Sequence, residues 1–421
     1  MYISLDNSPA ATTPHPPRGV RTVSSTVITL GIVSMLTDIS SESVSAILPL
    51  YITGFLGLST IAFGVLDGMY QGVSAVVRIA GGYASDRLDQ PKWVAFVGYA
   101  LAAVARVGLL FWSGFAALSA VITADRIGKG IRTAPRDALI TATSDPAYLG
   151  RSFGIHRMLD NIGAALGPLI AFVILLVVPD GFHIVFVASL AFAVIGVAVL
   201  ALLVPNVRRR RREDAGTRPP RVPWRSIVRG PMRRVLAAAG ILGLVTIGDG
   251  FVYLVLQARS DFAALWFPLL YVGTNVAFLA LAVPLGRLAD RVGRARVFVW
   301  GHVGLLAAYV VAALPFADIA ATILCLVFLG AFYAATDGVL SALVSQLNGP
   351  ESRATAIGTA QTVIAVTRFA SAAGFGILWY ALGREPAMLI VAIVLAVAIP
   401  LVAILLRPLL GAPQPHDSVA M

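Results

Sequence analysis

The sequence has little charge and almost no cysteine for its 421 residues. Charged side chains make up 13% of the chain, hydrophobic ones make up 58%, and the mean hydropathy is +0.85. A soluble chain carries about 25% charged residues, so this one could not cover its surface with polar groups, and disorder is excluded for the same reason. The single cysteine, Cys325, excludes a disulfide scaffold. A polytopic membrane protein remains, and the long apolar runs predict helices rather than barrel strands.

Motifs that carry enzymatic chemistry are missing as well. The sequence has no His-Glu-x-x-His metal site, no phosphate-binding Gly-x-x-x-x-Gly-Lys loop and no cysteine cluster. We therefore expect neither an enzyme nor a bound metal or other cofactor. Without a nucleotide-binding loop, any energy-requiring step that the chain performs would have to be driven by an ion gradient.

Lysine is nearly absent, yet the net charge is +11, because 30 of the 32 basic residues are arginine. Eleven arginines fall between Asn206 and Arg234, including the run Arg208–Arg212. A cytoplasmic loop that follows the positive-inside bias explains this run better than a nucleic-acid partner does. We expect these arginines to fix the topology and to contact anionic lipid headgroups.

The apolar pattern predicts twelve membrane-spanning helices at about 20 residues a crossing. The expected spans lie near 25–54, 59–84, 93–113, 115–137, 152–178, 182–204, 233–257, 262–286, 296–315, 319–344, 354–381 and 386–407. The expected fold class is an all-α polytopic membrane protein with two six-helix bundles. These bundles would occupy 24–204 and 233–408 and would be joined by an arginine-rich linker at 205–232.

The distribution of arginine also predicts the orientation. An even number of spans places both termini on one side, and the loops near 86–92, 132–151, 206–234 and 287–296 are arginine-rich. The opposite loops carry only Arg259 and Arg384. We expect a disordered tail at 1–23, with no cleaved signal, and a second tail at 409–421, both in the cytoplasm.

The two halves of the sequence repeat one another. The segment Gly82–Arg87 recurs as Gly286–Arg291, 204 residues later, with glycine at its start and Asp-Arg at its end. A six-helix unit that is duplicated across a basic linker is typical of secondary transporters, whose solute site lies near mid-membrane between the halves.

The repeated segment resembles the loop 2–3 signature of the major facilitator superfamily, Gly-x-x-x-Asp-Arg-x-Gly followed by basic residues. The second copy matches closely, whereas Asp89 replaces the second glycine of the first copy and Gln90 stands where a basic residue would. The resemblance implies the twelve-helix facilitator fold with a cytoplasmic conformational gate. The gate residues that it marks are Gly82, Asp86, Arg87, Gly286, Asp290, Arg291, Gly293 and Arg294. We expect the two aspartates to stabilise the outward-facing form through Arg126 or the helix start near Arg353.

Two further segments resemble helix motifs of the same superfamily. On the fourth helix, Arg126, Gly130 and Ala134 match, with Lys129 in place of a glutamine. On the fifth helix, the resemblance is to a motif associated with antiporters, although small residues there also allow close helix packing. The residues of this second motif are Gly163, Gly167 and Pro168.

The first helix is acidic and resembles helix 1 of twelve-helix drug–proton antiporters. Together with the fourth-helix segment it resembles a bacterial subgroup of the superfamily, which implies a location in the bacterial inner (plasma) membrane. Asp38 and Glu42 lie four residues apart and share a helix face. Two acids this close in a low dielectric do not both ionise readily, so one of them can take up and release a proton. The alternative is that Glu42 faces an outer vestibule while Asp38 holds a fixed salt bridge. His156 and Asp160 on the fifth helix are then the next candidates.

Other polar and charged side chains recur within the expected helices, where lipid packing alone would not require them. Each one can be satisfied by a structural partner, but together they predict a polar path. The candidates for proton coupling and the substrate pathway are Asp38, Glu42, Asp67, Gln71, Arg78, Asp125, Arg126, Lys129, His156, Asp160, Asp249, Asp337, Gln361 and Arg368.

These features predict a secondary active transporter that moves a small organic solute by alternating access. Proton-coupled export is the favoured mode, proton-coupled uptake is the alternative, and sodium coupling stays open. A membrane sensor or a lipid scrambling protein on the same fold is a different reading. The expected partners are the solute, protons and the lipid bilayer, with no nucleic acid, and we expect a monomer.

Overall fold

The computed structural model describes residues 23–88, 90–145, 148–206, 229–315, 318–349 and 352–410. The side chains at 75, 76, 78–88 and 354 lie outside the described set, as do most of the predicted linker and both predicted tails. Regular structure within the described ranges is helical throughout, which confirms the all-α class.

The first six spans form the N bundle. Its helices are α1 (Ser25–Leu50) with the π-helical turn η1 (Tyr51–Phe55), α2 (Thr60–Leu88), α3 (Pro91–Phe111), α4 (Phe115–Thr143), α5 (Leu149–Val177) and α6 (Phe182–Leu203). Within this bundle α1 packs against α5 and α6, while α4 packs against α2 and α3.

The last six spans form the C bundle. Its helices are α8 (Pro231–Leu244), α9 (Asp249–Ser260), α10 (Phe267–Val292) preceded by the 3-10 turn η3 (Ala264–Trp266), α11 (Arg294–Ala313), α12 (Ile319–Gln346), α13 (Arg353–Leu382) and α14 (Arg384–Leu410). Ten of the twelve spans are long and apolar enough to cross a membrane, and the other two, α2 and α4, carry much of the charge of the N bundle.

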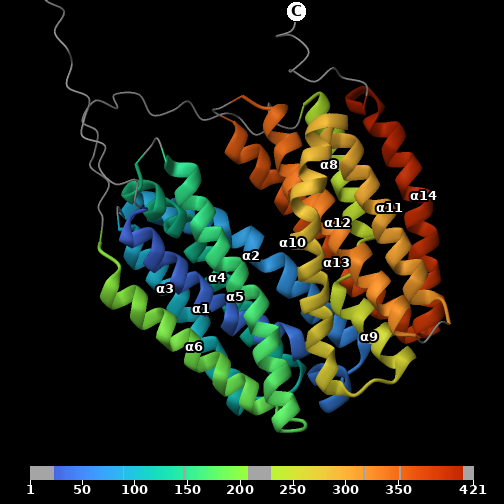
Figure 1. Cartoon of the computed structure of the whole chain (residues 1–421), viewed down its shortest axis with the longest axis horizontal. Helices are drawn as coiled ribbons and strands as arrows, with labels where there is room; N and C mark the ends of the chain where they lie inside the picture. Colours follow the sequence, from blue (N-terminus) through green and yellow to red (C-terminus); the bar gives the residue numbers. More distant parts are fainter. Residues whose placement is uncertain are drawn as a thin grey trace, which may run out of the picture.

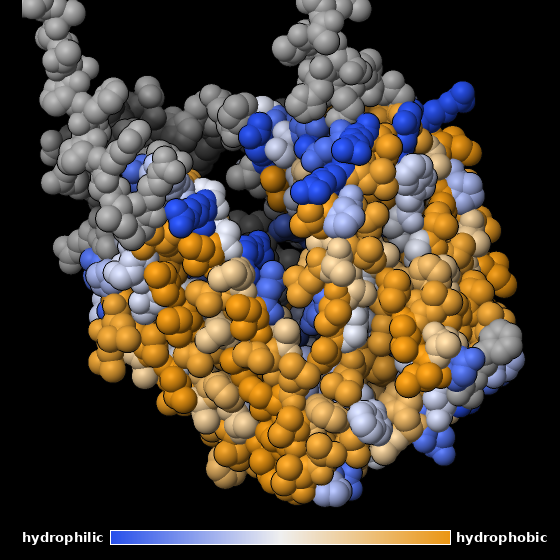
Figure 2. Space-filling view, in the orientation of Figure 1, coloured by the Kyte–Doolittle hydropathy of each residue, from blue (hydrophilic) through white to orange (hydrophobic). Residues whose placement is uncertain are grey.

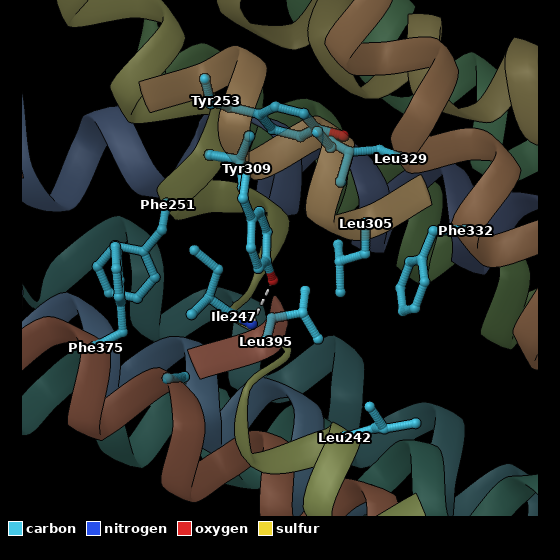
Figure 3. Close-up of a cluster of buried hydrophobic side chains, with 14 of the residues drawn as sticks. Leu242, Ile247, Phe251, Tyr253, Leu305, Tyr309, Leu329, Phe332, Phe375 and Leu395 are labelled. Atoms are coloured by element: carbon cyan, nitrogen blue, oxygen red, sulfur yellow. Dashed lines mark hydrogen bonds between the residues drawn. The ribbon is translucent and has the colours of Figure 1, made fainter. Parts of the chain in front are cut away.

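The seventh span is broken, so the prediction of one continuous helix over 233–257 was wrong. The break at 245–248 contains β-branched residues, which have low helix propensity, and Gly248 precedes α9. The freed N–H of Ile247 donates to Tyr309 Oη at 2.9 Å (Figure 3). A buried partner of this kind is required because no water is available to backbone groups inside a bilayer. Helical periodicity in the sequence cannot reveal a hydroxyl that comes from another helix.

The two bundles lie side by side and form a V (Figure 1). They meet at one end through α2 with α13 and α5 with α10, and they separate toward the end where α6 ends and α8 begins. Hydrophobic side chains cover their outer faces (Figure 2), among them Leu202 and Ile404. These faces are suited to lipid, whereas the polar side chains gather between the bundles.

Candidate transport site

A cavity of about 390 Å³ lies between the bundles, within the range usual for small-molecule sites. Four carboxylates and four tyrosines line it, and no lysine, arginine or histidine is among its described lining residues. The acids come from both bundles. They are Glu42 and Asp67 from the N bundle and Asp249 and Asp337 from the C bundle.

A second cavity, of about 800 Å³, adjoins the first on the side where the bundles separate. The two share Gln71, Phe278 and Asp337 as lining residues, so together they form one polar path. Gln361 and Arg368 from α13 line the second cavity. Figure 2 shows the hollow between the bundles, with hydrophilic side chains along its walls. Seven residues of the predicted path therefore share this space: Glu42, Asp67, Gln71, Asp249, Asp337, Gln361 and Arg368.

An aromatic cluster closes the opposite end of the first cavity. The ring centroid of Phe251 on α9 lies 4.6 Å from that of Phe63 on α2 and 4.8 Å from that of Phe375 on α13. All three rings are buried, and Trp379 lies beyond them on the wall of a separate cavity of about 560 Å³. Because these rings come from both bundles, they act as a seal between the central cavity and this outer space.

Glycines on α2 bring that helix against α13 at the sealed end. A Cβ atom on Gly64 would overlap the backbone carbonyl of Ala372, and one on Gly68 would lie 2.9 Å from the carbonyl of Phe369. Thr60 Oγ1 also donates to the carbonyl of Gly376 at 3.0 Å. Backbone contact of this closeness is what small residues permit in membrane helix pairs.

Asp67 lies across the boundary between the two bundles. It belongs to α2, but its carboxylate packs against Gly248 in the break between α8 and α9, where a Cβ atom would overlap Oδ2. This Oδ2 atom is fully buried and has no hydrogen-bond partner among the described residues. A buried carboxylate oxygen without a donor is costly unless it carries a proton or meets a cation.

Asp249 begins α9, directly after that break. Its Oδ1 accepts a 2.8 Å hydrogen bond from Tyr333 Oη on α12. Arg368 lies with its guanidinium carbon 5.8 Å from the Tyr333 ring centroid, and Asp337 and Asp249 are its acidic neighbours. The predicted residues of helices 7, 10 and 11 are thus brought into one group.

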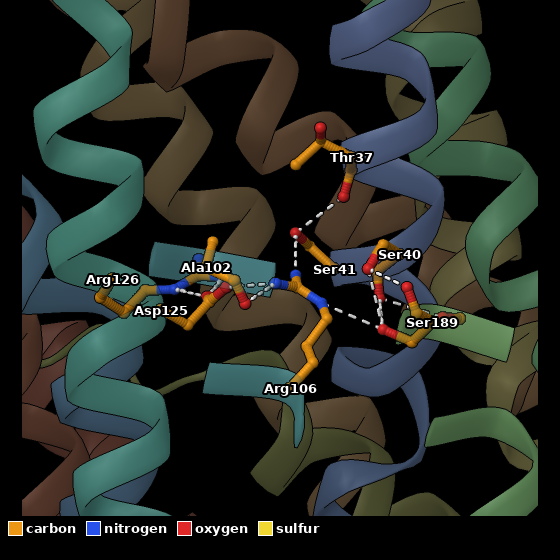
Figure 4. Close-up of polar contacts among 9 residues, drawn as sticks. Thr37, Ser40, Ser41, Ala102, Arg106, Asp125, Arg126 and Ser189 are labelled. Carbon is orange, nitrogen blue, oxygen red and sulfur yellow. Dashed lines mark hydrogen bonds and ion pairs between the residues drawn. The ribbon is translucent and has the colours of Figure 1, made fainter. Parts of the chain in front are cut away.

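A buried network of ion pairs occupies the N bundle next to the cavity (Figure 4). Asp125 on α4 accepts a 2.8 Å hydrogen bond from Arg106 on α3 and is also ion-paired with Arg126. Arg106 further donates to Ser41 Oγ of α1 at 2.9 Å and to Ser189 Oγ of α6 at 3.1 Å. Four helices are therefore tied together through one guanidinium.

The first-helix acid Asp38 meets a different partner from the one expected. Asp160 on α5 is an acidic neighbour of Asp38. Asp160 Oδ1 also accepts a 2.5 Å hydrogen bond from Ser34 Oγ, which in turn accepts one from Arg136 at 3.2 Å. Lys129 has both Asp38 and Glu42 as neighbours. The two pairs that the sequence predicts, Asp38 with Glu42 and His156 with Asp160, thus meet where α1 contacts α5. The Nε2 atom of His156 has no hydrogen-bond partner among the described residues.

With this geometry in place, the comparisons with known proteins identify the family. Residues 30–274 and 263–419 match the Major Facilitator Superfamily. The chain belongs to this superfamily. An uncharacterized MFS-type transporter of Methanocaldococcus jannaschii is 30% identical over 372 residues, which cover 85% of this chain and 89% of the relative.

Solved structures of facilitators have the same fold. The nucleoside transporter NupG superposes with a TM-score of 0.76 at 14% identity, over 91% of this chain and 100% of that one. A POT family transporter in complex with a thioalcohol-conjugated peptide gives a TM-score of 0.76 at 13% identity, over 92% and 96% of the two chains. At these identities the likeness shows the fold alone, and the drug–proton antiporter subtype stays a prediction.

The second copy of the facilitator gate motif is a turn between α10 and α11. Gly293 has φ of 108°, a conformation that favours glycine, and Arg294 donates to Asp290 Oδ1 at 2.9 Å. In this conformation Arg126 lies instead at Asp125, with its guanidinium carbon 3.7 Å from the Tyr70 ring centroid. The side chains of Arg78, Asp86 and Arg87, and all of Asp89, are outside the described residues.

The helix-5 motif of the facilitator holds α5 against α1. A Cβ atom on Gly163 would overlap the backbone of Met35, and one on Gly167 would lie 2.8 Å from the backbone nitrogen of Ser43. This close approach frames the stretch of α1 that carries Asp38 and brings it to Asp160. The packing explanation of these glycines and a functional one therefore coincide.

Sequence reasoning missed Arg106. The signal was available, because Arg106 is the only charged residue between Trp93 and Phe111 on the third predicted helix. A single arginine within an apolar span has to find a carboxylate or carbonyl partner, and its partner here is a residue that was predicted, Asp125.

Proposed function

We propose that this facilitator is a secondary active transporter that exchanges a small organic solute for protons in the direction of export. The observation that supports it best is the contact between Asp38 and Asp160. Two neighbouring carboxyl groups in a low dielectric do not both ionise readily, so one of them can hold a proton. Two helices, α1 and α5, therefore hold a site that can be loaded with a proton.

The surroundings of this pair supply a competing cation. Lys129 has Asp38 and Glu42 as neighbours, and Arg136 reaches Asp160 through Ser34. When the proton leaves, Lys129 or Arg136 can stabilise the carboxylate that remains. Since Lys129 also neighbours Glu42, which lines the central cavity, the protonation of Asp38 and the occupancy of the cavity are electrostatically linked.

The shape of the path supports alternating access. The central cavity is continuous with the space between the separated bundle ends and is sealed by aromatic rings at the other end. The open end is the one where α6 ends and α8 begins, at the two ends of the arginine-rich linker, and the positive-inside bias supports assigning it to the cytoplasm. Export is favoured over uptake by the resemblance of Gly163, Gly167 and Pro168 to the antiporter motif.

Everted membrane vesicles test this function. They are acidified inside, and a neutral nucleoside, an aromatic sulfonate and a quaternary ammonium ion are each added while the internal pH is followed. Exchange predicts that at least one solute class dissipates the gradient, and that vesicles with Asp38→Asn do not respond. Equal traces from the active protein and from Asp38→Asn would refute proton exchange at this site.

Two controls separate the other readings. The first control is a cysteine at Thr217. If it reacts with an impermeant maleimide added outside intact cells, the orientation is the reverse of the one proposed, and the same exchange chemistry would make the protein an uptake system. A sensor or scrambling protein would leave the gradient unaffected by every solute class.

A further inference from the structure

The central cavity carries an imbalance of charge that bears on the solute itself. We infer that it selects an organic cation, with an ammonium group placed between Asp67 of α2 and Asp249 of α9. This inference rests on the proposed function, because it names the solute class for the same cavity.

The lining of the cavity is acidic on every side that the structure describes. None of the four acids forms an ion pair with a described side chain. Lys129 is a basic neighbour of Glu42, whereas Asp67, Asp249 and Asp337 share one cation among the described residues, Arg368. One guanidinium balances only one of three carboxylates, so negative charge remains for a ligand beside Asp67 and Asp249.

Asp67 lacks the partner that a buried acid normally has. Its Oδ2 atom is fully buried and has no hydrogen-bond donor in the described part of the chain, while the side chain as a whole lines the cavity. Asp249 Oδ1 is held by Tyr333 of the same bundle, so this carboxylate is fixed across the bundle boundary from Asp67. A cation that enters between them would balance the charge of the Asp67 carboxylate and meet a second carboxylate already fixed in place.

Tyrosine rings supply the second component of a cation site. Tyr271 on α10 has Asp67, Asp249 and Glu42 as its acidic neighbours, and its ring centroid lies 4.6 Å from that of Tyr253. The face of Tyr70 is already occupied by Arg126, and Tyr333 lies near Arg368. Tyr271 is therefore the ring that can stack on a solute cation, an interaction that contributes about 2 kcal/mol when it is desolvated.

The same carboxylates explain why a cation would exchange with protons. Asp67 without a cation is stabilised by a proton, and an arriving ammonium group makes that proton unnecessary. The charged and titratable groups around Asp67 and Asp249 are Glu42 on α1, Tyr70 on α2, Tyr253 on α9, Tyr271 on α10, Tyr309 on α11, Tyr333 and Asp337 on α12, and Arg368 on α13. None of these groups places a positive charge inside the central cavity.

Calorimetric titration of the purified full chain in detergent tests the inference with three probes of similar size. They are phenyltrimethylammonium, N,N-dimethylaniline and benzenesulfonate, which are cationic, neutral and anionic at neutral pH. We expect the cation to bind at least about tenfold more tightly than either of the others, which corresponds to about 1.4 kcal/mol. Equal binding of the three, or tighter binding of benzenesulfonate, would overturn the inference.

Matched variants locate the site. Asp249→Asn is expected to weaken binding of phenyltrimethylammonium about tenfold or more, whereas Asp261→Asn, at the other end of the same helix, is expected to leave it unchanged. Asp261 is an exposed residue with φ of 46°, a conformation that asparagine also adopts. If Asp249→Asn fails to fold, Tyr271→Leu serves instead, with an expected loss of about tenfold. Undiminished binding in whichever of these two variants folds would refute the placement.

The outcome is separable from that of the proposed function. Gradient dissipation in everted vesicles by the nucleoside or the sulfonate, without binding of phenyltrimethylammonium, would support proton exchange and reject the cation site. Selective binding of phenyltrimethylammonium with no solute-dependent proton flux would support the cation site and reject proton exchange.

Discussion

Arg106 of α3 and Asp125 of α4 form a 2.8 Å ion pair that is buried in the N bundle. The pair is also held by Arg126, Ser41 and Ser189, so it connects the helices around the cavity (Figure 4). Breaking a buried pair leaves a charge without compensation in a low dielectric, which costs about 3–5 kcal/mol.

The number of orphaned charges predicts an order of stability for two substitutions. Asp125→Leu leaves both Arg106 and Arg126 without their carboxylate, whereas Arg106→Leu leaves Asp125 paired with Arg126. We expect both to lower the melting temperature of the detergent-purified protein, and Asp125→Leu to lower it more. Arg294→Leu is the control, because its partner Asp290 is 62% exposed and such pairs contribute about 1 kcal/mol or less. A larger loss for Arg106→Leu would contradict the order.

The Asp38–Asp160 contact predicts a separation of driven flux from exchange. We expect Asp38→Asn and Asp160→Asn to lose gradient-driven transport by about tenfold or more while they retain gradient-independent solute exchange, since the cavity lining stays intact. Glu42→Gln tests the pairing of Asp38 with Glu42 that the sequence alone predicts. If proteoliposomes with Asp38→Asn and Asp160→Asn keep full gradient-driven flux, proton coupling resides elsewhere.

The glycine contact between α2 and α13 predicts a shift of the gate. Gly64→Leu places a side chain where the carbonyl of Ala372 lies, so it should separate the bundles at their sealed end. In a Cys325→Ser background, a cysteine at Ser45 should then react with an impermeant maleimide added outside cells. Gly374→Leu is the control, because this residue of α13 has open space around its α-carbon. In that variant the cysteine of Ser45→Cys should stay protected from the maleimide. Protection in both would show that this contact does not hold the gate.

The facilitator gate motif predicts an effect on rate rather than on affinity. Asp290 is ion-paired with Arg294 in an exposed turn, so Asp290→Asn should cost about 1 kcal/mol of stability or less. We expect it to lower the transport rate with nearly unchanged solute affinity, because the expected role of the aspartate is to stabilise the outward-facing form. Initial rates and equilibrium binding measured side by side decide this, and a variant that loses binding but keeps its rate would exclude the role.

The sequence predicted those features that depend on periodicity and composition. Twelve spans and the charged character of α2 and α4 follow from residues that are close along the chain, and the duplication follows from matching one segment of the sequence with another. The break at 245–248 does not, because it is completed by Tyr309, 62 residues away from Ile247. Asp38 and Asp160 were both predicted but in separate pairs, since only the packing of α5 on α1 brings them together. Arg106 was missed because its partner, Asp125, lies on another helix.

The position of Asp67 against Gly248 links the hydration of this carboxylate to the conformation of the protein. The carboxylate belongs to one bundle and its dry surroundings belong to the other, so the bundles cannot part at the sealed end without withdrawing it from the break. Once withdrawn, the same oxygen atoms face water and no longer need a proton or a cation. Hydration of a single side chain is therefore tied to the mechanical opening of the molecule, and each change of shape alters which ion the protein prefers to hold.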